Sequence, residues 1–326
     1  MDFGDLAGNA VAKRQTAAYI DAGRFPHALL IEGEPGSGRR TMASRIARAA
    51  ICRETDPARR PCGVCAACRK AEHPDILTVV PEKTQIPVER IRDLRRDAFV
   101  RPNESERRVL LFPDAGTTLP PPGQNALLKI LEEPPAHLLF ILTCENRTQL
   151  LETIRSRCVC VTMEPVSWEE AEPLLKKRLP RADTDTLRRA HGMYGGRIGR
   201  ILDGVSDGTA EQTARLTAEF ADAIIAPTES VLLRLTARLE KDRDLTAGVL
   251  NGLREIFRDA LMISYGGTAA FAAPDQAGRL AARITAPRLL RLIEQTDRLA
   301  ADLAASMNNT LLLTRMCAVL RQAAGY

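Results

Sequence analysis

Four of the eight cysteines in this 326-residue chain lie close together, at a spacing typical of a metal site. They are spaced C-x9-C-x2-C-x2-C, at Cys52, Cys62, Cys65 and Cys68. Paired CxxC spacing lets thiolates converge from a tight turn, and four thiolates complete a tetrahedral zinc site with no coordination position left for water. The pattern therefore predicts a structural zinc ion. Four free thiols or a redox pair are the alternative.

A glycine-rich segment has the frame of a phosphate-binding loop. It reads Gly33-Glu-Pro-Gly36-Ser-Gly38-Arg39-Arg40-Thr41 and lies between an apolar run and a helical pattern. In such loops a Lys follows the last glycine and reaches the phosphates, and the next Ser or Thr binds Mg²⁺. Here arginines occupy both positions, and the threonine comes one residue late. We therefore expect a degenerate loop, which leaves ATP binding open, and a plain strand-to-helix turn is the alternative.

The acidic residue that usually completes such a site is also displaced. In P-loop ATPases an Asp at the end of another strand helps to hold the metal ion. The candidate strand here covers residues 108–112, and it is followed by Pro113, so that Asp114 comes one residue late. Because both metal anchors are altered, we expect no ATP hydrolysis by the chain itself.

Short apolar runs alternate with helical patterns in the first half of the chain. The apolar runs are at 29–32, 76–80, 108–112, 139–143 and 159–162, and helical patterns lie at 42–50, 88–100 and 124–133. This alternation predicts an α/β fold in which helices cover both faces of a parallel sheet. We expect a first domain at 1–165, with the cysteine cluster in an insertion at about 51–70.

The second half of the chain has helical patterns only. We expect a small helical domain at 166–207 and an all-helical domain at 208–326, where apolar residues recur at helical spacing. The composition, 45% apolar and 27% charged, is that of a globular protein, and a net charge of +5 permits contact with nucleic acid without requiring it. The sequence has no signal-like N-terminus and no apolar run of membrane length, which favours a cytoplasmic protein without membrane contact.

Four sequence segments follow one another in a characteristic order. They are Arg24-Phe-Pro-His27-Ala-Leu-Leu-Ile-Glu-Gly33, the cysteine cluster, Asn125-Ala-Leu-Leu-Lys129-Ile-Leu-Glu132-Glu133-Pro134-Pro135 and Ser156-Arg157-Cys158. In this order they resemble the clamp-loader branch of the AAA+ proteins. The resemblance is strong from about Gly8 to Pro165, and beyond Pro165 it rests on helical architecture and length.

The resemblance implies the rest of the organisation. It implies an AAA+ module, a small helical lid domain and a helical collar domain that packs with other subunits in a pentamer. The implied partners are delta and the gamma or tau ATPases, and through the complex the sliding clamp and primed DNA. The altered phosphate loop resembles that of the stator-like, non-hydrolysing subunit type, which is an accessory part of the DNA polymerase III holoenzyme.

Two sets of residues match functional residues of the family. The four clustered cysteines match its zinc ligands. Arg157 matches an arginine finger that acts on the ATP of a neighbouring subunit, a role that suits an always-charged, planar guanidinium. The alternative for Arg157 is a surface arginine or an arginine that caps a strand.

Three other functions compete with this interpretation. A gamma or tau ATPase also carries the cysteine cluster and Ser-Arg-Cys, but Arg39, Arg40 and Pro113 argue against it. An independent P-loop enzyme needs intact phosphate chemistry. A zinc-ribbon DNA-binding protein would bind specific DNA sequences as an isolated chain.

Overall fold

The computed structural model describes residues 1–22, 25–269, 273–305 and 308–326. It divides into two units, Met1–Val166 and Ser167–Tyr326. Arg24, which opens one of the sequence segments quoted above, lies outside the described residues.

The first unit is built on a parallel sheet of five strands. The strands are β1 (Ala28–Glu32), β2 (Ile76–Thr78), β3 (Arg108–Phe112), β4 (Leu138–Cys144) and β5 (Val159–Thr162). Their order is β2-β3-β4-β1-β5, and each neighbouring pair is parallel. All seven residues of β4 are buried, as expected for a central strand covered on both faces. The predicted parallel α/β sheet is therefore confirmed.

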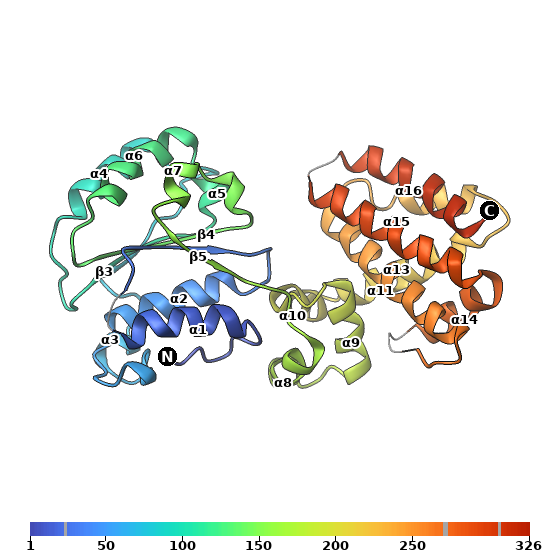
Figure 1. Cartoon of the computed structure of the whole chain (residues 1–326), viewed down its shortest axis with the longest axis horizontal. Helices are drawn as coiled ribbons and strands as arrows, with labels where there is room; N and C mark the ends of the chain where they lie inside the picture. Colours follow the sequence, from blue (N-terminus) through green and yellow to red (C-terminus); the bar gives the residue numbers. More distant parts are fainter. Residues whose placement is uncertain (23–24, 270–272, 306–307) are drawn as a thin grey trace. The chain divides into compact units, whose positions relative to one another are not determined.

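Helices cover both faces of this sheet (Figure 1). On one side are α1 (Ala10–Asp21), α2 (Arg39–Ile51) and α3 (Ala66–Arg69), and on the other α4 (Val88–Asp97), α5 (Ala115–Thr118), α6 (Pro121–Glu132) and α7 (Glu152–Arg155). Successive residues of a strand point to opposite faces. In β1, Leu29 and Ile31 accordingly pack in the core with Met42 of α2, whereas Leu30 packs in the other core with Leu127 of α6.

Two 3-10 turns complete the first unit: η1 (Pro57–Arg59) lies in the cysteine-containing connection, and η2 (Arg147–Gln149) follows β4. The helix predicted from Gln124 begins earlier, at Pro121, because proline is tolerated in the first turn, where its missing N–H costs no hydrogen bond. The helix predicted to continue to Val100 ends at Asp97.

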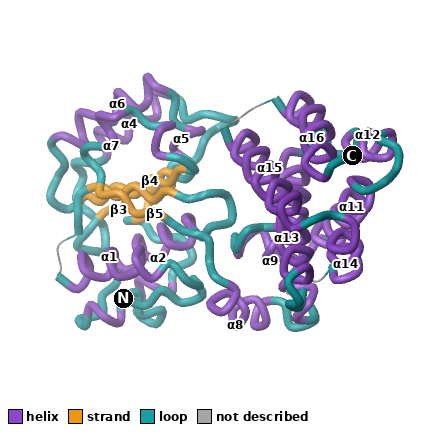
Figure 2. The backbone as a smooth tube through the Cα atoms, turned by 45° about the vertical axis from the view of Figure 1, so that its right-hand side comes forward, coloured by secondary structure: helices purple, strands orange, loops and turns teal. Residues whose placement is uncertain are grey.

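The described part of the second unit contains helices and no strand (Figure 2). The helices are α8 (Trp168–Arg178), α9 (Thr184–Met193), α10 (Ile198–Asp207), α11 (Thr209–Ile224), α12 (Ser230–Thr236), α13 (Arg243–Ser264), α14 (Pro274–Arg283), α15 (Ala286–Ala304) and α16 (Asn309–Ala324). This confirms the predicted helical C-terminal part. Its division into two domains at residue 207 stays a prediction.

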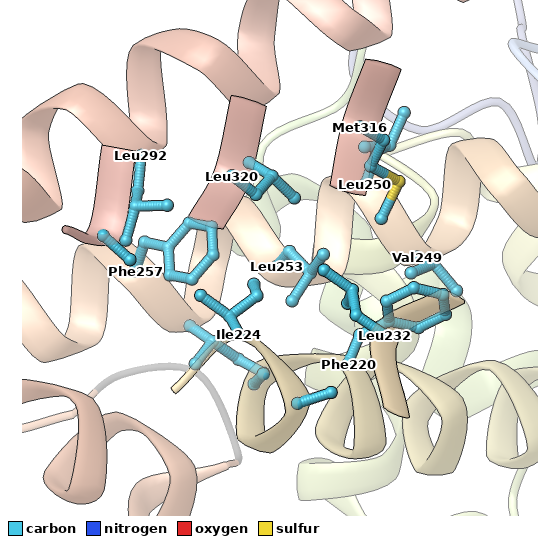
Figure 3. Close-up of a cluster of buried hydrophobic side chains, with 14 of the residues drawn as sticks. Phe220, Ile224, Leu232, Val249, Leu250, Leu253, Phe257, Leu292, Met316 and Leu320 are labelled. Atoms are coloured by element: carbon cyan, nitrogen blue, oxygen red, sulfur yellow. The ribbon is translucent and has the colours of Figure 1, made fainter. Parts of the chain in front are cut away.

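Helix α13 is the centre of the second unit. It contacts α9, α11, α14 and α15, and its side chains Leu250, Leu253 and Phe257 are fully buried (Figure 3). Leu292 and Leu320, from α15 and α16, belong to the same core. Among the described residues, no helix combines the length and the apolar character needed to span a membrane.

Candidate phosphate loop, metal centre and arginine finger

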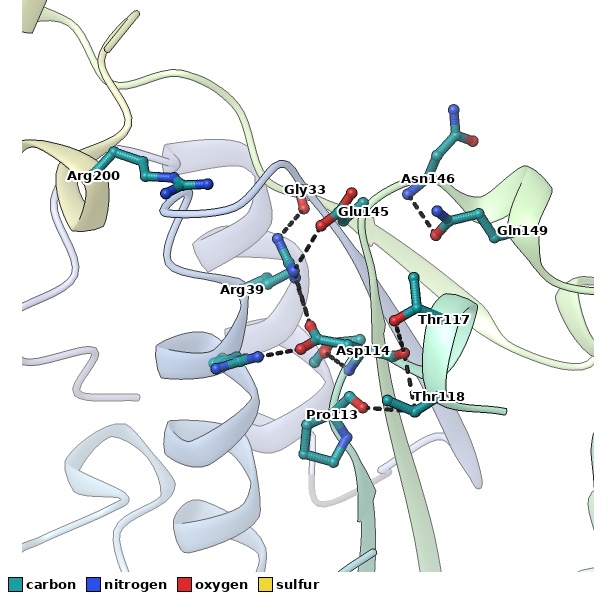
Figure 4. A network of polar contacts seen from close by, with 12 residues as sticks. Gly33, Arg39, Pro113, Asp114, Thr117, Thr118, Glu145, Asn146, Gln149 and Arg200 are labelled. Atoms are coloured by element: carbon teal, nitrogen blue, oxygen red, sulfur yellow. Dashed lines mark hydrogen bonds and ion pairs between the residues drawn. The ribbon is translucent and has the colours of Figure 1, made fainter. Parts of the chain in front are cut away.

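The carboxyl edge of the sheet brings three segments of the first unit together (Figure 4). The glycine loop follows β1, Asp114 comes shortly after β3, and Glu145 follows β4 directly. Strand β4 lies between β1 and β3 in the sheet, so the ends of all three strands are neighbours. Ligands of parallel α/β proteins bind at this edge.

The glycines of the loop are required by its backbone. Gly36 and Gly38 have φ values of 84° and 92°, in the left-handed region that favours glycine. At Gly33 a Cβ atom would lie 2.5 Å from the Ser37 Oγ, so a side chain would collide with the loop. The segment connects β1 to α2, which begins at Arg39. The strand-loop-helix frame expected from the sequence is therefore present.

The Arg39 side chain forms hydrogen bonds with the glycine loop and with Asp114. Its guanidinium is nearly buried, with 6% of the residue exposed, and it donates a hydrogen bond of 2.7 Å to the Gly33 carbonyl. It also donates to Asp114 Oδ1, with an Nη2 to Oδ1 distance of 2.9 Å, and it lies 3.7 Å from Glu145 Oε1. The side chain at the lysine position is therefore engaged by its own chain.

Asp114 is the acceptor for both arginines. Oδ1 accepts from Arg39 and Oδ2 accepts from the more exposed Arg40. The backbone of Asp114 is left-handed, with φ of 51°, and its N–H donates to the Thr143 hydroxyl at 2.9 Å. Burial raises the pKa of this carboxyl, but the hydrogen bonds from Arg40 and Arg39 outweigh burial, and the net pKa is lowered. Both carboxylate oxygens thus have cationic partners from the chain itself.

Thr41 does not join this group. It is exposed in the first turn of α2, where it lines a cavity with Ser44, Pro61 and Cys68 on the side of the cysteine loop. A threonine one residue late in the motif is rotated by about 100° around a helix of 3.6 residues per turn.

Asp114→Asn should change the acid sensitivity of the first unit. A carboxyl whose folded-state pKa is lowered stabilises the fold above its unfolded pKa, near 3.9, and the contribution is lost as the pH falls through the folded value. At pH 7 we expect the variant to lose about 1–3 kcal/mol, mainly from the bond to buried Arg39, because the exposed Arg40 contributes little. Urea unfolding monitored between pH 3 and 7 measures both effects.

The matched control for this prediction is Asp97→Asn, which removes an exposed carboxylate at the end of α4. Between pH 5 and 3 the wild-type chain and the control should lose more stability than Asp114→Asn. If the free energy of unfolding fell equally with pH in all three proteins, Asp114 would carry no such stabilisation.

The four clustered cysteines converge in the structure. Their sulfur atoms all lie within 4.8 Å of one another, and the Cys52 and Cys65 sulfurs are 4.0 Å apart. A tetrahedral site with zinc–sulfur bonds of 2.3 Å requires sulfurs about 3.8 Å apart. None of the four forms a disulfide bond. The cluster is therefore close enough to bind a metal ion, and its geometry fits zinc.

Backbone N–H groups donate hydrogen bonds to three of the four sulfurs. Cys62 N–H donates to the Cys52 sulfur, Cys65 N–H to the Cys62 sulfur and Cys68 N–H to the Cys65 sulfur, at 3.3–3.4 Å. Burial raises the pKa of Cys65, but backbone hydrogen bonds from Arg53 and Cys68 outweigh it and lower the pKa to about 6. When bound, zinc would cross-link the end of α2 to α3.

Arg157 lies far from the phosphate loop of its own chain. It precedes β5, and the register pairs Val159 of β5 with Leu29 of β1. Arg157 is thus level with His27, six residues before Gly33, which corresponds to about 20 Å along a strand. The guanidinium lies toward the amino ends of the strands, whereas the loop lies at their carboxyl ends, so the structure does not bring these two predicted sites together.

Two contacts hold the Arg157 side chain, which is 34% exposed. Nη1 donates to the Thr153 carbonyl and Nη2 to Glu132 Oε1, both at 2.9 Å. Sequence reasoning identified Arg157 but did not pair it with Glu132, because 25 residues separate them and no local pattern signals the contact. Sequence reasoning likewise missed the pairing of Asp114 with both arginines.

A parallel sheet with a glycine loop after its first strand, covered by helices on both faces, defines a P-loop α/β module. A family model described as "DNA polymerase III, delta subunit" matches residues 8–167. The chain is 35% identical over 150 residues to the delta-prime subunit of Yersinia pestis and 32% identical over 190 residues to that of Escherichia coli. It is 36% identical over 159 residues to the gamma/tau subunit of Mycobacterium tuberculosis. Residues 8–167 therefore belong to the clamp-loader family of AAA+ proteins.

These matches cover parts of each protein. The Yersinia match covers 44% of this chain and 44% of the relative, and the Escherichia match covers 57% and 56%. The Mycobacterium match covers 48% of this chain and 27% of the relative. Among solved structures, a gamma subunit-related protein of Thermotoga maritima is similar at 17% identity and a TM-score of 0.43. That similarity covers 97% of this chain and 100% of the Thermotoga protein.

Proposed function

We propose that the chain is a non-hydrolysing, stator-like subunit of the delta-prime type in a DNA polymerase III clamp loader. In this role it would help to load the sliding clamp onto primed DNA. The observation that carries the proposal is the pairing of Asp114 with Arg39 and Arg40 at the carboxyl edge of the sheet.

This pairing opposes ATP hydrolysis for two electrostatic reasons. A divalent cation held at Asp114 would meet two guanidinium groups that already neutralise the carboxylate. Arg39 must also break its bonds to Gly33 and Asp114 before it can reach a phosphate. The pairing therefore occupies both the carboxylate that would anchor Mg²⁺ and the cation at the lysine position, the two groups that P-loop catalysis uses. The glycine loop retains the backbone frame with which it could hold a nucleotide without hydrolysing it.

The second candidate function is a gamma or tau type ATPase, which is favoured by 36% identity to the Mycobacterium gamma/tau subunit. It requires a catalytic phosphate loop, whereas the first candidate requires none. ATP turnover by the isolated chain therefore separates the two.

The other proposed features follow from the same assignment. Zinc held by the four cysteines would be structural, and Arg157 would act in trans on the ATP of an adjacent subunit. Residues 166–207 would form a lid domain and residues 208–326 a collar domain that assembles with delta and the gamma or tau subunits. The proposed location is the cytoplasm, where the replication machinery works.

The proposal predicts stable association without intrinsic ATPase activity. When the full chain is co-expressed with a tagged gamma/tau ATPase and the delta protein of the same organism, all three should co-purify. The isolated chain should hydrolyse ATP at the background rate, with or without clamp and primed DNA, because Asp114 is paired with arginines. Turnover that Arg39→Ala abolishes would establish the ATPase candidate instead, and failure to co-purify would contradict both.

A further inference from the structure

Helix α6 holds the Arg157 segment at two points. Near its start the buried Gln124 side chain donates to the Leu119 carbonyl at 2.9 Å and accepts the Leu151 N–H at 2.8 Å, directly before α7. At its last residue Glu132 pairs with Arg157. Gln124 and Glu132 are eight positions apart, which corresponds to about 12 Å along the helix. One helix, α6, therefore fixes the positions of both α7 and Arg157.

The two anchors differ in strength. Gln124 is buried, so breaking its bonds would leave polar groups unsatisfied inside the protein. The Glu132 and Arg157 side chains are 49% and 34% exposed, and ion pairs exposed to this degree are weak and screened by water. The backbone of the segment is therefore fixed, whereas the guanidinium can exchange its partner.

We propose that Glu132 is a positioning residue that holds Arg157 in a resting position and releases it when the guanidinium engages the phosphates of an adjacent subunit. This inference rests on the proposed role of Arg157 in trans. A carboxylate 2.9 Å from the guanidinium would lie close to the phosphate oxygens that Arg157 contacts, and like charges at that distance repel. Glu132 therefore competes with the phosphate for the same cation.

The competition sets how often Arg157 is free before clamp and DNA bind. Glu132→Gln keeps the shape of the side chain and one oxygen acceptor but removes the charge. In the complete clamp loader we expect this variant to raise ATP turnover without clamp and DNA by about two- to five-fold. The maximal rate with clamp and DNA should change less than two-fold, because Arg157 is by then already engaged.

The matched control is Glu133→Gln, which removes the next carboxylate of the same exposed helix end and should leave both rates unchanged. A merely structural role of Glu132 would act independently of Arg157. We therefore expect Glu132→Gln to have no effect in the Arg157→Ala background, as a double-mutant cycle requires for a coupled pair.

The assay is ATP turnover by complexes reconstituted from full-length subunits, with and without clamp and primed DNA. An unchanged unstimulated rate in Glu132→Gln would overturn the inference, and so would an equal rise in the Arg157→Ala background. If Arg157→Ala itself left the stimulated rate at the wild-type value, the proposed finger would fail and this inference with it. The three results are distinct, so failure of the resting contact cannot be confused with failure of the proposed function.

Discussion

Arg157→Ala should lower ATP hydrolysis at the adjacent site of the clamp loader by about 10³-fold or more, the contribution of cross-interface arginines in other P-loop systems. The register of β5 on β1 sets Arg157 level with His27, about 20 Å along the strand from its own phosphate loop, so under the proposed role in trans the loss appears in another subunit. A planar, permanently charged guanidinium stabilises the charge that develops on the transferred phosphate. Clamp- and DNA-stimulated turnover by the reconstituted complex is the measurement.

The loss in bulk turnover will be smaller than the loss at one site. In the proposed complex the other ATP sites would keep their own arginines, so clamp loading under limiting ATP is the more sensitive measurement. Arg157→Lys should restore little activity, because an ammonium cannot reproduce the two-pronged hydrogen bonding of a guanidinium. Folding, zinc content and assembly should stay intact, since the side chain is partly exposed and makes contacts only at the surface.

Arg181→Ala serves as the control, because it removes an exposed arginine of the second unit, away from the Ser156-Arg157-Cys158 segment. It should load clamps at the wild-type rate. If Arg157→Ala assembled normally and also loaded clamps at that rate, Arg157 would be a structural arginine that caps β5.

The strands of the sheet could be predicted because each strand is one continuous segment of the sequence. Parallel strands buried on both faces read as continuous apolar runs, and the run at 139–143 became β4, every residue of which is buried. The cysteine cluster could be predicted for a related reason. Three of its members lie within one short segment, so their spacing already brings the sulfurs near one another.

The partners of the charged residues could not be predicted in the same way. Asp114 was expected to be displaced from the site by Pro113, yet its left-handed backbone directs the carboxylate to both arginines. That contact joins residues 75 positions apart in the sequence, and it exists only because β3 and β1 flank β4 in the sheet. Neither hydrophobic periodicity nor motif spacing contains the strand order, so neither could reveal the pairing.

Loss of one zinc ligand should have the largest effect on the stability of the first unit. Cys65 is the N-cap of α3, and its sulfur accepts the Cys68 N–H. Cys65→Ser keeps a side chain that can cap the helix but removes a thiolate ligand of the metal. Ala67 of α3 packs in the same core as Ile51 of α2, and loss of the metal would therefore disturb that core. We expect a loss of about 4 kcal/mol or more, equivalent to a fall in Tm of roughly 10 °C.

Zinc content and thermal unfolding should be measured on the same preparations. The wild-type chain, purified without added metal, should contain about one zinc per chain, because closed thiolate sites couple metal binding to local folding. Cys160→Ser is the matched control for metal content, since this cysteine lies on β5, outside the cluster, and the variant should retain the metal. Fully folded wild-type protein with less than about a tenth of an equivalent of zinc would contradict the prediction. So would a Cys65→Ser variant that unfolds at the wild-type temperature, because a metal that binds only to the folded state must stabilise that state.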